Sequence, residues 1–344
     1  MISRFPLRST FILGAIGITA VAAPVLLIQV GLIDAYIALI LTMGGVNAIM
    51  AMSVNMIVGI TGQLSLGQAG FMAIGAYTCI FFHFDVGLPL PIAAVCAVLF
   101  TAFMGFLIGF PVLKLSGDYL AIVTLGFGEI IRVVLNNLGP LTGGPSGRQF
   151  NTIMARIGYG WLAFAVTTGT LIVVLALLQN FLRSSYGRAI KACREDEIAA
   201  NANGINIFRY KMLGFVISAF IAGVGGALFA MVQGFVVPDV AQFLRSIDFL
   251  IFVVLGGMGS MTGAILSAYV LTSLQEFLRF LGDFRIIIYA VILILVMLFR
   301  PKGLLGTREL SFVGLVDKMP AWLAMVRRKV GGKCGPSRQK ADRT

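Results

Sequence analysis

The stretch NMIVGITGQLSLGQAGFMAIGAY, residues 55–77, interrupts a strongly apolar sequence with small and polar residues. It contains five glycines, two glutamines and one asparagine. Elsewhere, apolar runs recur from residue 9 to residue 299, and about 20 apolar residues suffice to cross the hydrocarbon core. A break inside a span frees backbone polar groups, which are tolerated only against protein or a water-filled cavity. The stretch therefore predicts a broken helix in the interior of a membrane protein.

Composition supports the membrane class. The 344 residues are 59% hydrophobic and 12% charged, whereas a soluble domain is about 25% charged. The net charge is +12, but the cations are clustered: 11 of the 26 Lys and Arg residues lie between Arg300 and Arg343, and another six between Arg183 and Lys211. Clusters of this kind are typical of cytoplasmic segments under the positive-inside rule. The charge thus indicates topology and does not indicate a nucleic-acid partner.

The apolar runs predict the order of the spans. A retained first helix is expected within residues 10–30, with its N-terminus inside. Loop 139–160 is then outside, and Lys114 and the insertion 183–211 are inside. Further spans are expected at residues 37–58, 64–83, 91–113, 117–137, 160–182 and 209–232.

The C-terminal third carries apolar stretches at 247–258, 261–281 and 286–299, of which the first and last are short for a span. A pair that enters from outside, breaks at GGMGSMTG (256–263) and returns places the basic tail 305–344 inside. The predicted fold is an all-α polytopic membrane protein with about eight spanning helices plus this re-entrant or broken pair. Residues 1–304 are expected to form the transmembrane domain.

Two glycine-rich interruptions, 59–70 and 255–263, fall in the two halves of the chain. Paired interruptions in corresponding halves point to a transport site between internal repeats. We therefore predict a possible internal repeat. A helix N-terminus at such a break can bind an anionic group without a full positive charge.

Polar residues at predicted membrane depth are the candidates for the pathway. A charge there costs about 2.5–3.5 kcal/mol, so each needs a partner or water. Glu129 and Glu276 have Arg132 and Arg279 three residues on, and a structural ion pair is the favoured interpretation for Glu276 and an alternative for Glu129. Whether Gln63 and Gln68 contact cargo or a neighbouring helix stays open. The candidate pathway residues are Asn55, Thr61, Gln63, Ser65, Gln68, Thr124, Glu129 and Asp248.

Enzyme chemistry has no support in the sequence. The four cysteines are scattered, and His83 is the only histidine. No nucleophile and base, metal cluster or G-x-x-x-x-G-K-[ST] phosphate loop is present. We predict no catalytic residue, no metal and no cofactor bound by this chain, so any driving ATP is bound elsewhere. A proton-driven carrier would need a relay of acidic or histidine residues, and the sequence gives little indication of one.

The insertion RSSYGRAIKACREDEIAANANGINIFRYK (183–211) predicts a charged helix over 187–204, ended by Gly204. By its residues alone it is equally a docking surface and a solvated loop. Within it, EIAANANGI (197–205) resembles the EAA loop of ABC-transporter permeases, which docks into the ATPase. Ala199, Ala200 and Gly204 fit that pattern, and Glu197 lies one position early.

Other segments resemble one family in the same order. They are the opening stretch, GDYLAIVTLGFGEIIRVVLNNLGPLTGGPSG (117–147), YGRAIKACREDEIAANANGIN (186–206) and VVLGGMGSMTGAILSA (253–268). The chain is similar to the high-affinity branched-chain amino acid permeases of ABC systems and looks like their M-type subunit. The urea permeases of ABC systems are similar as well.

The resemblance implies a multi-pass protein of the bacterial inner membrane with both termini cytoplasmic. It implies a homologous permease subunit, two cytoplasmic ATPases that hold ATP and Mg²⁺, and a periplasmic binding protein as partners. The expected function is ATP-driven import of leucine, isoleucine and valine. Urea or another small amide or amino acid is the alternative, followed by an ion-gradient-driven carrier. The expected ATPase-coupling residues are Arg188, Arg194, Glu195, Asp196, Glu197, Ala200 and Gly204.

Overall fold

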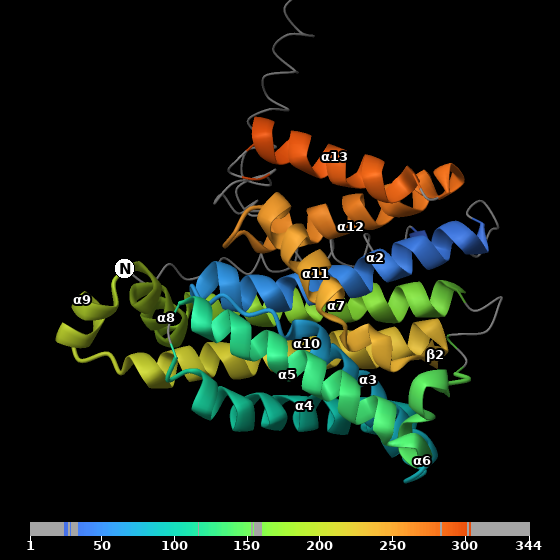
Figure 1. Cartoon of the computed structure of the whole chain (residues 1–344), viewed down its shortest axis with the longest axis horizontal. Helices are drawn as coiled ribbons and strands as arrows, with labels where there is room; N and C mark the ends of the chain where they lie inside the picture. The colour runs from blue at the N-terminus through green and yellow to red at the C-terminus, as the bar shows by residue number, and fades with distance from the viewer. Residues whose placement is uncertain are drawn as a thin grey trace, which may run out of the picture. The chain divides into compact units, whose positions relative to one another are not determined.

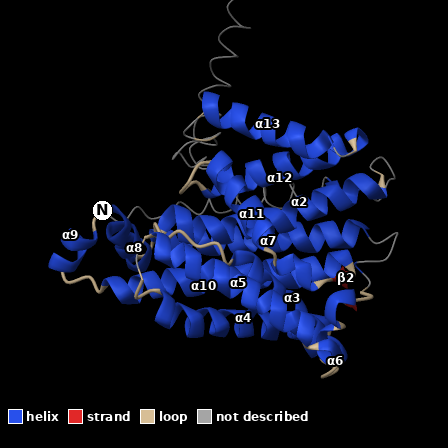
Figure 2. Cartoon of the chain, viewed as in Figure 1, coloured by secondary structure: helices blue, strands red, loops and turns tan. Residues whose placement is uncertain are grey.

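The computed structural model describes residues 24–26, 28, 34–115, 117–152, 154, 160–282, 284–300 and 303. Most of the first helix expected within 10–30 and the whole of tail 305–344 lie outside these residues. In the described part, six helices are long and apolar enough to cross a membrane, and shorter apolar helices accompany them. The structure is almost entirely helical, as Figure 2 shows, and this confirms the predicted all-α polytopic fold.

The first group of helices follows the predicted spans closely. It consists of α2 (Ala35–Val54), a π-helix η1 (Asn55–Ile60), α3 (Gln68–Phe84), α4 (Leu90–Val112) and α5 (Asp118–Asn137). One boundary differs, because α3 begins at Gln68 and not at residue 64. Residues 61–67 form no regular structure, so the predicted break is longer than its glycines alone indicate.

A middle group connects the two ends of the bundle. It consists of α6 (Gly139–Thr142), η2 (Gly144–Ser146), β1 (Arg148–Gln149), α7 (Gly160–Arg183), α8 (Ser185–Glu195) and α9 (Glu197–Ala202). In Figure 1, α8 and α9 lie at one end of the helices and α6 at the other. We call these the α8–α9 end and the β1–β2 end.

The last group completes the described fold. It consists of α10 (Ile207–Gln233), β2 (Phe235–Val236), η4 (Pro238–Ala241), α11 (Phe243–Gly256), α12 (Met261–Phe277), η5 (Leu278–Leu281) and α13 (Phe284–Phe299). β1 pairs antiparallel with β2, with Arg148 opposite Val236 and Gln149 opposite Phe235. This pairing ties the loop after α5 to the segment after α10.

The same order of elements occurs twice. In each half a long helix is followed by a connecting segment, a short helix and two further helices. The first half has α2, the segment 61–67, α3, α4 and α5. The second half has α10, the segment 234–242 with β2 and η4, α11, α12 and α13. By this order the counterpart of the first break is 234–242. The predicted pairing of 59–70 with 255–263 as corresponding positions is therefore wrong. Glycines are found where two backbones approach closely as well as where helices break. The glycines of 255–263 allow such a close approach, because a Cβ added at Gly256 would lie 2.5 Å from the Gly263 carbonyl oxygen.

The predicted broken pair is present as α11 and α12, which pack against each other. α11 has 14 residues and is preceded by the segment 234–242, which contains β2 and η4. Residues 261–281 form an apolar stretch of 21 residues. The second arm is therefore long enough to cross a membrane, and α12 also packs along α2.

The two long helices α2 and α10 form the centre. In their most apolar windows, 72% and 78% of residues are buried, compared with 28–39% for the windows in α4, α5, α7 and α12. α3 packs between α10, α4 and α5. Because the outer helices leave apolar side chains exposed on faces that suit lipid, the centre is the place to look for polar function.

α3 crosses α10 with the two backbones in contact. A Cβ added at Gly75 would lie 2.7 Å from the Gly223 carbonyl oxygen, and one at Gly226 would lie 2.0 Å from the Met72 carbonyl oxygen. Small residues at helix crossings allow such close approach in membranes. These glycines therefore determine the distance between α3 and α10.

Replacement of Gly226 by alanine should separate α3 from α10. Overpacking of this kind costs about 1–3 kcal/mol, so the melting temperature of the purified protein should fall by several degrees. Gly126→Ala is the matched control, because nothing lies within 4 Å of its added Cβ and alanine is the better helix former by about 1 kcal/mol. Equal melting temperatures for the two variants would contradict the close crossing.

At the β1–β2 end, Arg148 fastens the loop after α5 to the loop after α3. Its Nη1 and Nη2 donate to the two carboxylate oxygens of Asp85 at 2.7 and 2.8 Å, and Nη1 also donates to the Leu141 carbonyl at 2.6 Å. This pairing lowers the pKa of Asp85 below its ordinary value. Bidentate arginine–carboxylate pairs are the stronger and more specific ion pairs.

The pair gives stability a defined dependence on pH. Because the pKa of Asp85 is lowered in the folded state, its contribution is present above the ordinary carboxyl pKa and is lost as pH falls through the lowered value. Asp85→Asn should cost about 1 kcal/mol at pH 7, a modest figure because the pair is partly exposed, and less at pH 3, which is below the ordinary carboxyl pKa. Asp34→Asn, whose side chain makes no capping bond, should show no such difference in thermal unfolding. A constant cost at both pH values would contradict the assignment.

Candidate functional site

The two glycine-rich breaks meet at Asn55. This residue is fully buried at the start of the π-helix η1. Its Oδ1 accepts a hydrogen bond from the Gly259 N–H at 2.8 Å, and its Nδ2 lies 3.4 Å from the Met261 Sδ. A Cβ added at Gly59 would lie 2.5 Å from the Gly259 nitrogen, so the backbones touch. Side-chain amide and glycine together join the first break to the turn between α11 and α12.

Arg194 on α8 reaches the same junction. Its Nη1 donates to the carbonyl oxygen of Gly59, one of the groups that the end of η1 frees. A Cβ added at Gly62 would lie 2.9 Å from the Arg194 Cγ, and one at Gly259 would lie 3.4 Å from Nη1. The arginine thus contacts both breaks, and α8 is joined directly to the centre of the protein.

The irregular segment 61–67 places three predicted pathway residues. Gln63, Ser65 and Gln68 are 4%, 2% and 1% exposed. The Gln68 Oε1 accepts from the Ser53 hydroxyl at 3.0 Å, and the Gln63 Oε1 lies 3.5 Å from the Thr61 hydroxyl. The Nε2 atoms of both glutamines and the Ser65 Oγ have no hydrogen-bond partner among the described residues. The Gln68 amide oxygen therefore holds the fold, and the nitrogens of both amides lack a partner in the described residues.

Two threonines hold segment 61–67 in place. The Thr124 hydroxyl on α5 accepts from the Leu66 N–H at 3.0 Å and donates to the Leu120 carbonyl. The Thr61 hydroxyl donates to the Ile57 carbonyl, and its methyl group occupies the space left by Gly214 on α10. Both predicted pathway residues are buried, and their hydroxyls are used in hydrogen bonds that hold the fold.

The short helices α3 and α11 begin inside the protein and are capped by other helices. The N–H of Ala69, in the first turn of α3, donates to the Ser246 hydroxyl on α11 at 3.1 Å. The N–H of Phe243, at the start of α11, donates to Glu129 Oε1 on α5 at 3.2 Å. Helix N-termini leave N–H groups that need such acceptors. Ser246 was not among the predicted residues, because nothing local marks a hydroxyl that acts across two helices.

Glu129 therefore joins a small charged network. Arg132 Nε donates to its Oε2 at 2.8 Å, and Arg132 Nη1 lies 3.4 Å from the Asp239 Oδ1 of η4. The ion pair predicted from spacing is confirmed. The structure adds the α11 cap, so the charge of Glu129 has a clear structural use.

Glu276 is also paired. Glu276 forms the predicted pair with Arg279 at 2.8 Å and accepts a hydrogen bond from Tyr36. Asp248 is half-buried on α11, and its charge interacts with that of Arg245, three residues earlier. Sequence analysis did not consider Arg245, although the i, i+3 spacing was readable.

The charged insertion forms two helices where one was predicted over 187–204. α8 ends at Glu195, and Asp196 is extended and caps α9, accepting from the N–H groups of Ile198 at 2.8 Å and Ala199 at 3.0 Å. An aspartate that competes for backbone donors starts a new helix and ends the old one. Gly204 has φ +79° and ends α9 as predicted, with Ile205 N–H bonded to the Ala200 carbonyl at 3.1 Å.

The remaining coupling candidates differ in how far their side chains are exposed. Arg188 and Glu195 are exposed on α8, and Ala200 is buried. Glu197 pairs with Lys211, at the start of α10, with 2.6 Å between Oε1 and Nζ. Ile198 between these residues is 84% exposed. An isolated apolar side chain at the tip of a charged helix was not singled out from the sequence, because its exposure depends on the turn at Asp196.

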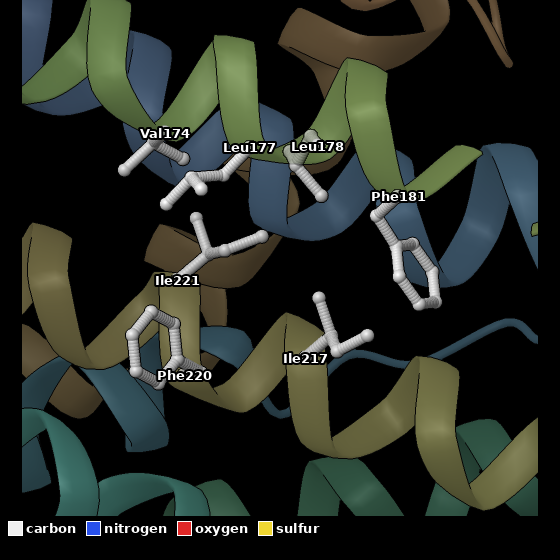
Figure 3. A pocket seen from close by; sticks show the side chains of 7 residues that line it. All are labelled: Val174, Leu177, Leu178, Phe181, Ile217, Phe220 and Ile221. Carbon is white, nitrogen blue, oxygen red and sulfur yellow. The ribbon is translucent and has the colours of Figure 1, made fainter. Parts of the chain in front are cut away.

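Two cavities differ in chemistry. Figure 3 shows one of about 200 Å³ between α7 and α10, lined only by apolar side chains: Val174, Leu177, Leu178, Phe181, Ile217, Phe220 and Ile221. It offers nothing to pair with a charged solute. The second, about 150 Å³, lies at the α8–α9 end and is lined by Gly62, Gln63, Leu64, Leu113, Leu115, Gly117, Leu120, Glu197 and Lys211. Within the described ranges, no three His, Cys, Asp or Glu side chains gather as a metal site.

Comparison with known proteins assigns the family. The family model described as "Branched-chain amino acid transport system / permease component" matches residues 36–299. The chain belongs to this permease family. It is 39% identical to the high-affinity branched-chain amino acid transport system permease protein LivM of Escherichia coli (strain K12), with 87% of this chain and 75% of that protein covered.

More distant relatives include other permease types. The LivH protein of Escherichia coli is 28% identical over 42% of this chain and 47% of that protein. The nucleoside ABC transporter permease NupC of Lactococcus lactis subsp. cremoris is 28% identical over 49% of this chain and 59% of that protein. This permease is thus a multi-pass transport protein and not an enzyme, with similarity to both members of a permease pair.

The Asn55 junction of the permease can be tested by local exchange. Asn55→Ala leaves the buried Gly259 N–H without its acceptor, at a cost of about 1–3 kcal/mol. Amide hydrogen exchange at residues 257–260 should therefore accelerate roughly 10-fold to 100-fold.

Asn47→Ala is the matched control, because Asn47 lies on α2, directly before η1, and bonds to α12 through the Thr272 hydroxyl at 3.0 Å. It should leave exchange at 257–260 near the wild-type rate. Equal acceleration in both variants, or none in Asn55→Ala, would show that Asn55 does not hold the junction.

Proposed function

We propose that this chain is the M-type permease subunit of an ATP-driven importer for branched-chain amino acids. The observation that supports this most directly is Arg194, which carries a contact from the exposed helix pair α8–α9 to the junction of both breaks. A transporter driven by partner ATPases needs such a mechanical link. A carrier driven by an ion gradient does not.

Movement of α8 would act on the centre through this link. The Gly59 carbonyl is freed where η1 ends, and π-helical turns are often found at functional sites. Displacement of Arg194 removes the donor from this carbonyl and loosens the contact with Gly259. The turn at Gly259 connects α11 to α12, so one displaced side chain changes both halves of the fold.

We place the α8–α9 end in the cytoplasm. The cations Lys114, Arg183, Arg209 and Lys211 lie in or next to segments at this end, together with those of α8, as the positive-inside rule requires. The β1–β2 end then faces the periplasm and a substrate-binding protein. A homologous permease subunit and membrane lipid cover the exposed apolar faces, and both chain termini are cytoplasmic in a bacterial inner membrane.

The docking surface for an ATPase is α9 with the exposed side of α8. Ile198, 84% exposed, is the apolar anchor, and Arg188, Glu195 and Asp196 are exposed polar residues of the same segment. Interfaces typically consist of a few buried anchors within a polar rim. ATP and Mg²⁺ are held by two such ATPase subunits, and this chain binds no cofactor of its own.

Substrate identity is tested by reconstituting the complex in liposomes and measuring ATP-dependent uptake of labelled leucine. Unlabelled leucine, isoleucine and valine should each compete, and urea and a nucleoside should not. Competition by urea without competition by leucine would assign the chain to the alternative substrate. Uptake without ATPase partners but with an ion gradient would assign it to the carriers.

The link is tested by Arg194→Gln, which removes the donor to Gly59. The complex should assemble and hydrolyse ATP at a near-normal rate, while leucine uptake per ATP falls at least 10-fold. Lys191→Gln is the control, because it removes a positive charge from an exposed position of the same helix. Unchanged uptake in Arg194→Gln would show that the link does not carry the coupling.

A further inference from the structure

The small cavity at the α8–α9 end has a polar side and an apolar side. Gln63, Glu197 and Lys211 form the polar side, and Leu64, Leu113 and Leu120 belong to the apolar side. We propose that this cavity is an exit site that binds the zwitterion of an aliphatic amino acid before its release. The inference rests on the proposed function, because it concerns the same cargo.

Gln63 provides the first recognition element. Its side chain is 96% buried, since only 4% is exposed, and its Oε1 faces the Thr61 hydroxyl at 3.5 Å. The residue lines the cavity, and its Nε2 has no acceptor in the described part of the chain. A buried donor without a partner costs about 1–3 kcal/mol. A carboxylate in the cavity would supply the missing acceptor.

The pair Lys211–Glu197 provides the second element. The two groups are 2.6 Å apart, and their side chains are 19% and 54% exposed. Lysine has three N–H donors and a carboxylate has several acceptor positions, so one shared bond leaves capacity on both. An amino acid is itself a pair of opposite charges. Its carboxylate can bind between Lys211 and Gln63 while its ammonium binds Glu197, and no net charge is buried.

The apolar side determines the rest of the ligand. Leucine side chains line it, and Gly62 and Gly117 leave space because they carry no side chain. Gly117 has φ +62° and nothing within 4 Å of an added Cβ. The volume is about 150 Å³, well below the roughly 300–1,000 Å³ of sites for drug-sized ligands. A small aliphatic side chain fits these walls, and glycine would leave them without contact.

The cavity also adjoins the link to the ATPase. Gly62 lies against the Arg194 Cγ, Gln63 follows directly, and Glu197 is on α9. A ligand here therefore contacts the same segment that Arg194 holds. Occupation of the exit site and the position of α8 are consequently coupled.

The test measures protection of an engineered cysteine in the assembled complex. Leu115 lines the cavity and is 41% exposed, so Leu115→Cys should react with a maleimide. L-Leucine should slow this reaction at least 3-fold. Leucinamide, which lacks the carboxylate, 4-methylpentanoate, which lacks the ammonium, and glycine should not. Lys114→Cys, one residue away and outside the lining, is the control and should react equally with and without leucine.

Gln63→Leu and Lys211→Met, each combined with Leu115→Cys, should abolish the protection while the complex still assembles. Protection by leucine that survives both changes would overturn the proposal, as would no protection in the parent. A measurement of leucine uptake distinguishes failure of the exit site from failure of the proposed function. If ATP-driven leucine uptake is normal and protection is absent, only the exit site fails. If the complex does not take up leucine at all, the proposed function fails first.

Discussion

The interaction on which the structure depends is the hydrogen bond from the Gly259 N–H to the Asn55 carboxamide. Inside a bilayer every backbone polar group needs a partner within the protein, and each irregular segment of this permease meets that requirement through a side chain of another helix. A side chain at Gly59 has no room, because its Cβ would lie 2.5 Å from the Gly259 nitrogen. The amide of Asn55, in the first break, therefore accepts a hydrogen bond from the backbone of the turn at Gly259 and holds that turn beside the first break.

The two halves of the fold cap each other in the same way. α3 begins at a hydroxyl from α11, and α11 begins at a carboxylate from α5. Neither short helix reaches its cap within its own segment, so neither half is complete without the other. A change in their relative position exposes helix N-termini in the interior. In a transporter, N–H groups exposed in this way carry a partial positive charge and can bind an anionic cargo.

Most polar residues at depth are used by the fold. Thr61, Thr124, Glu129 and Glu276 have partners that explain their burial. The amide nitrogens of Gln63 and Gln68 are different, because neither has a hydrogen-bond partner among the described residues. The Gln68 oxygen accepts from the Ser53 hydroxyl and so serves the fold, and contact of either glutamine with cargo stays a prediction.

The sequence by itself determined the membrane class, the order of the spans and most helix bounds to within a few residues, because apolar length and charge placement act locally. It also located Gly204 as a helix end and two i, i+3 ion pairs. Only the tertiary structure decided that 234–242 corresponds to the first break, that Asn55 bonds to Gly259, and that Arg194 reaches Gly59. These features depend on contacts between residues up to about 200 positions apart, for example Asn55 with Gly259, and local patterns carry no information about such contacts.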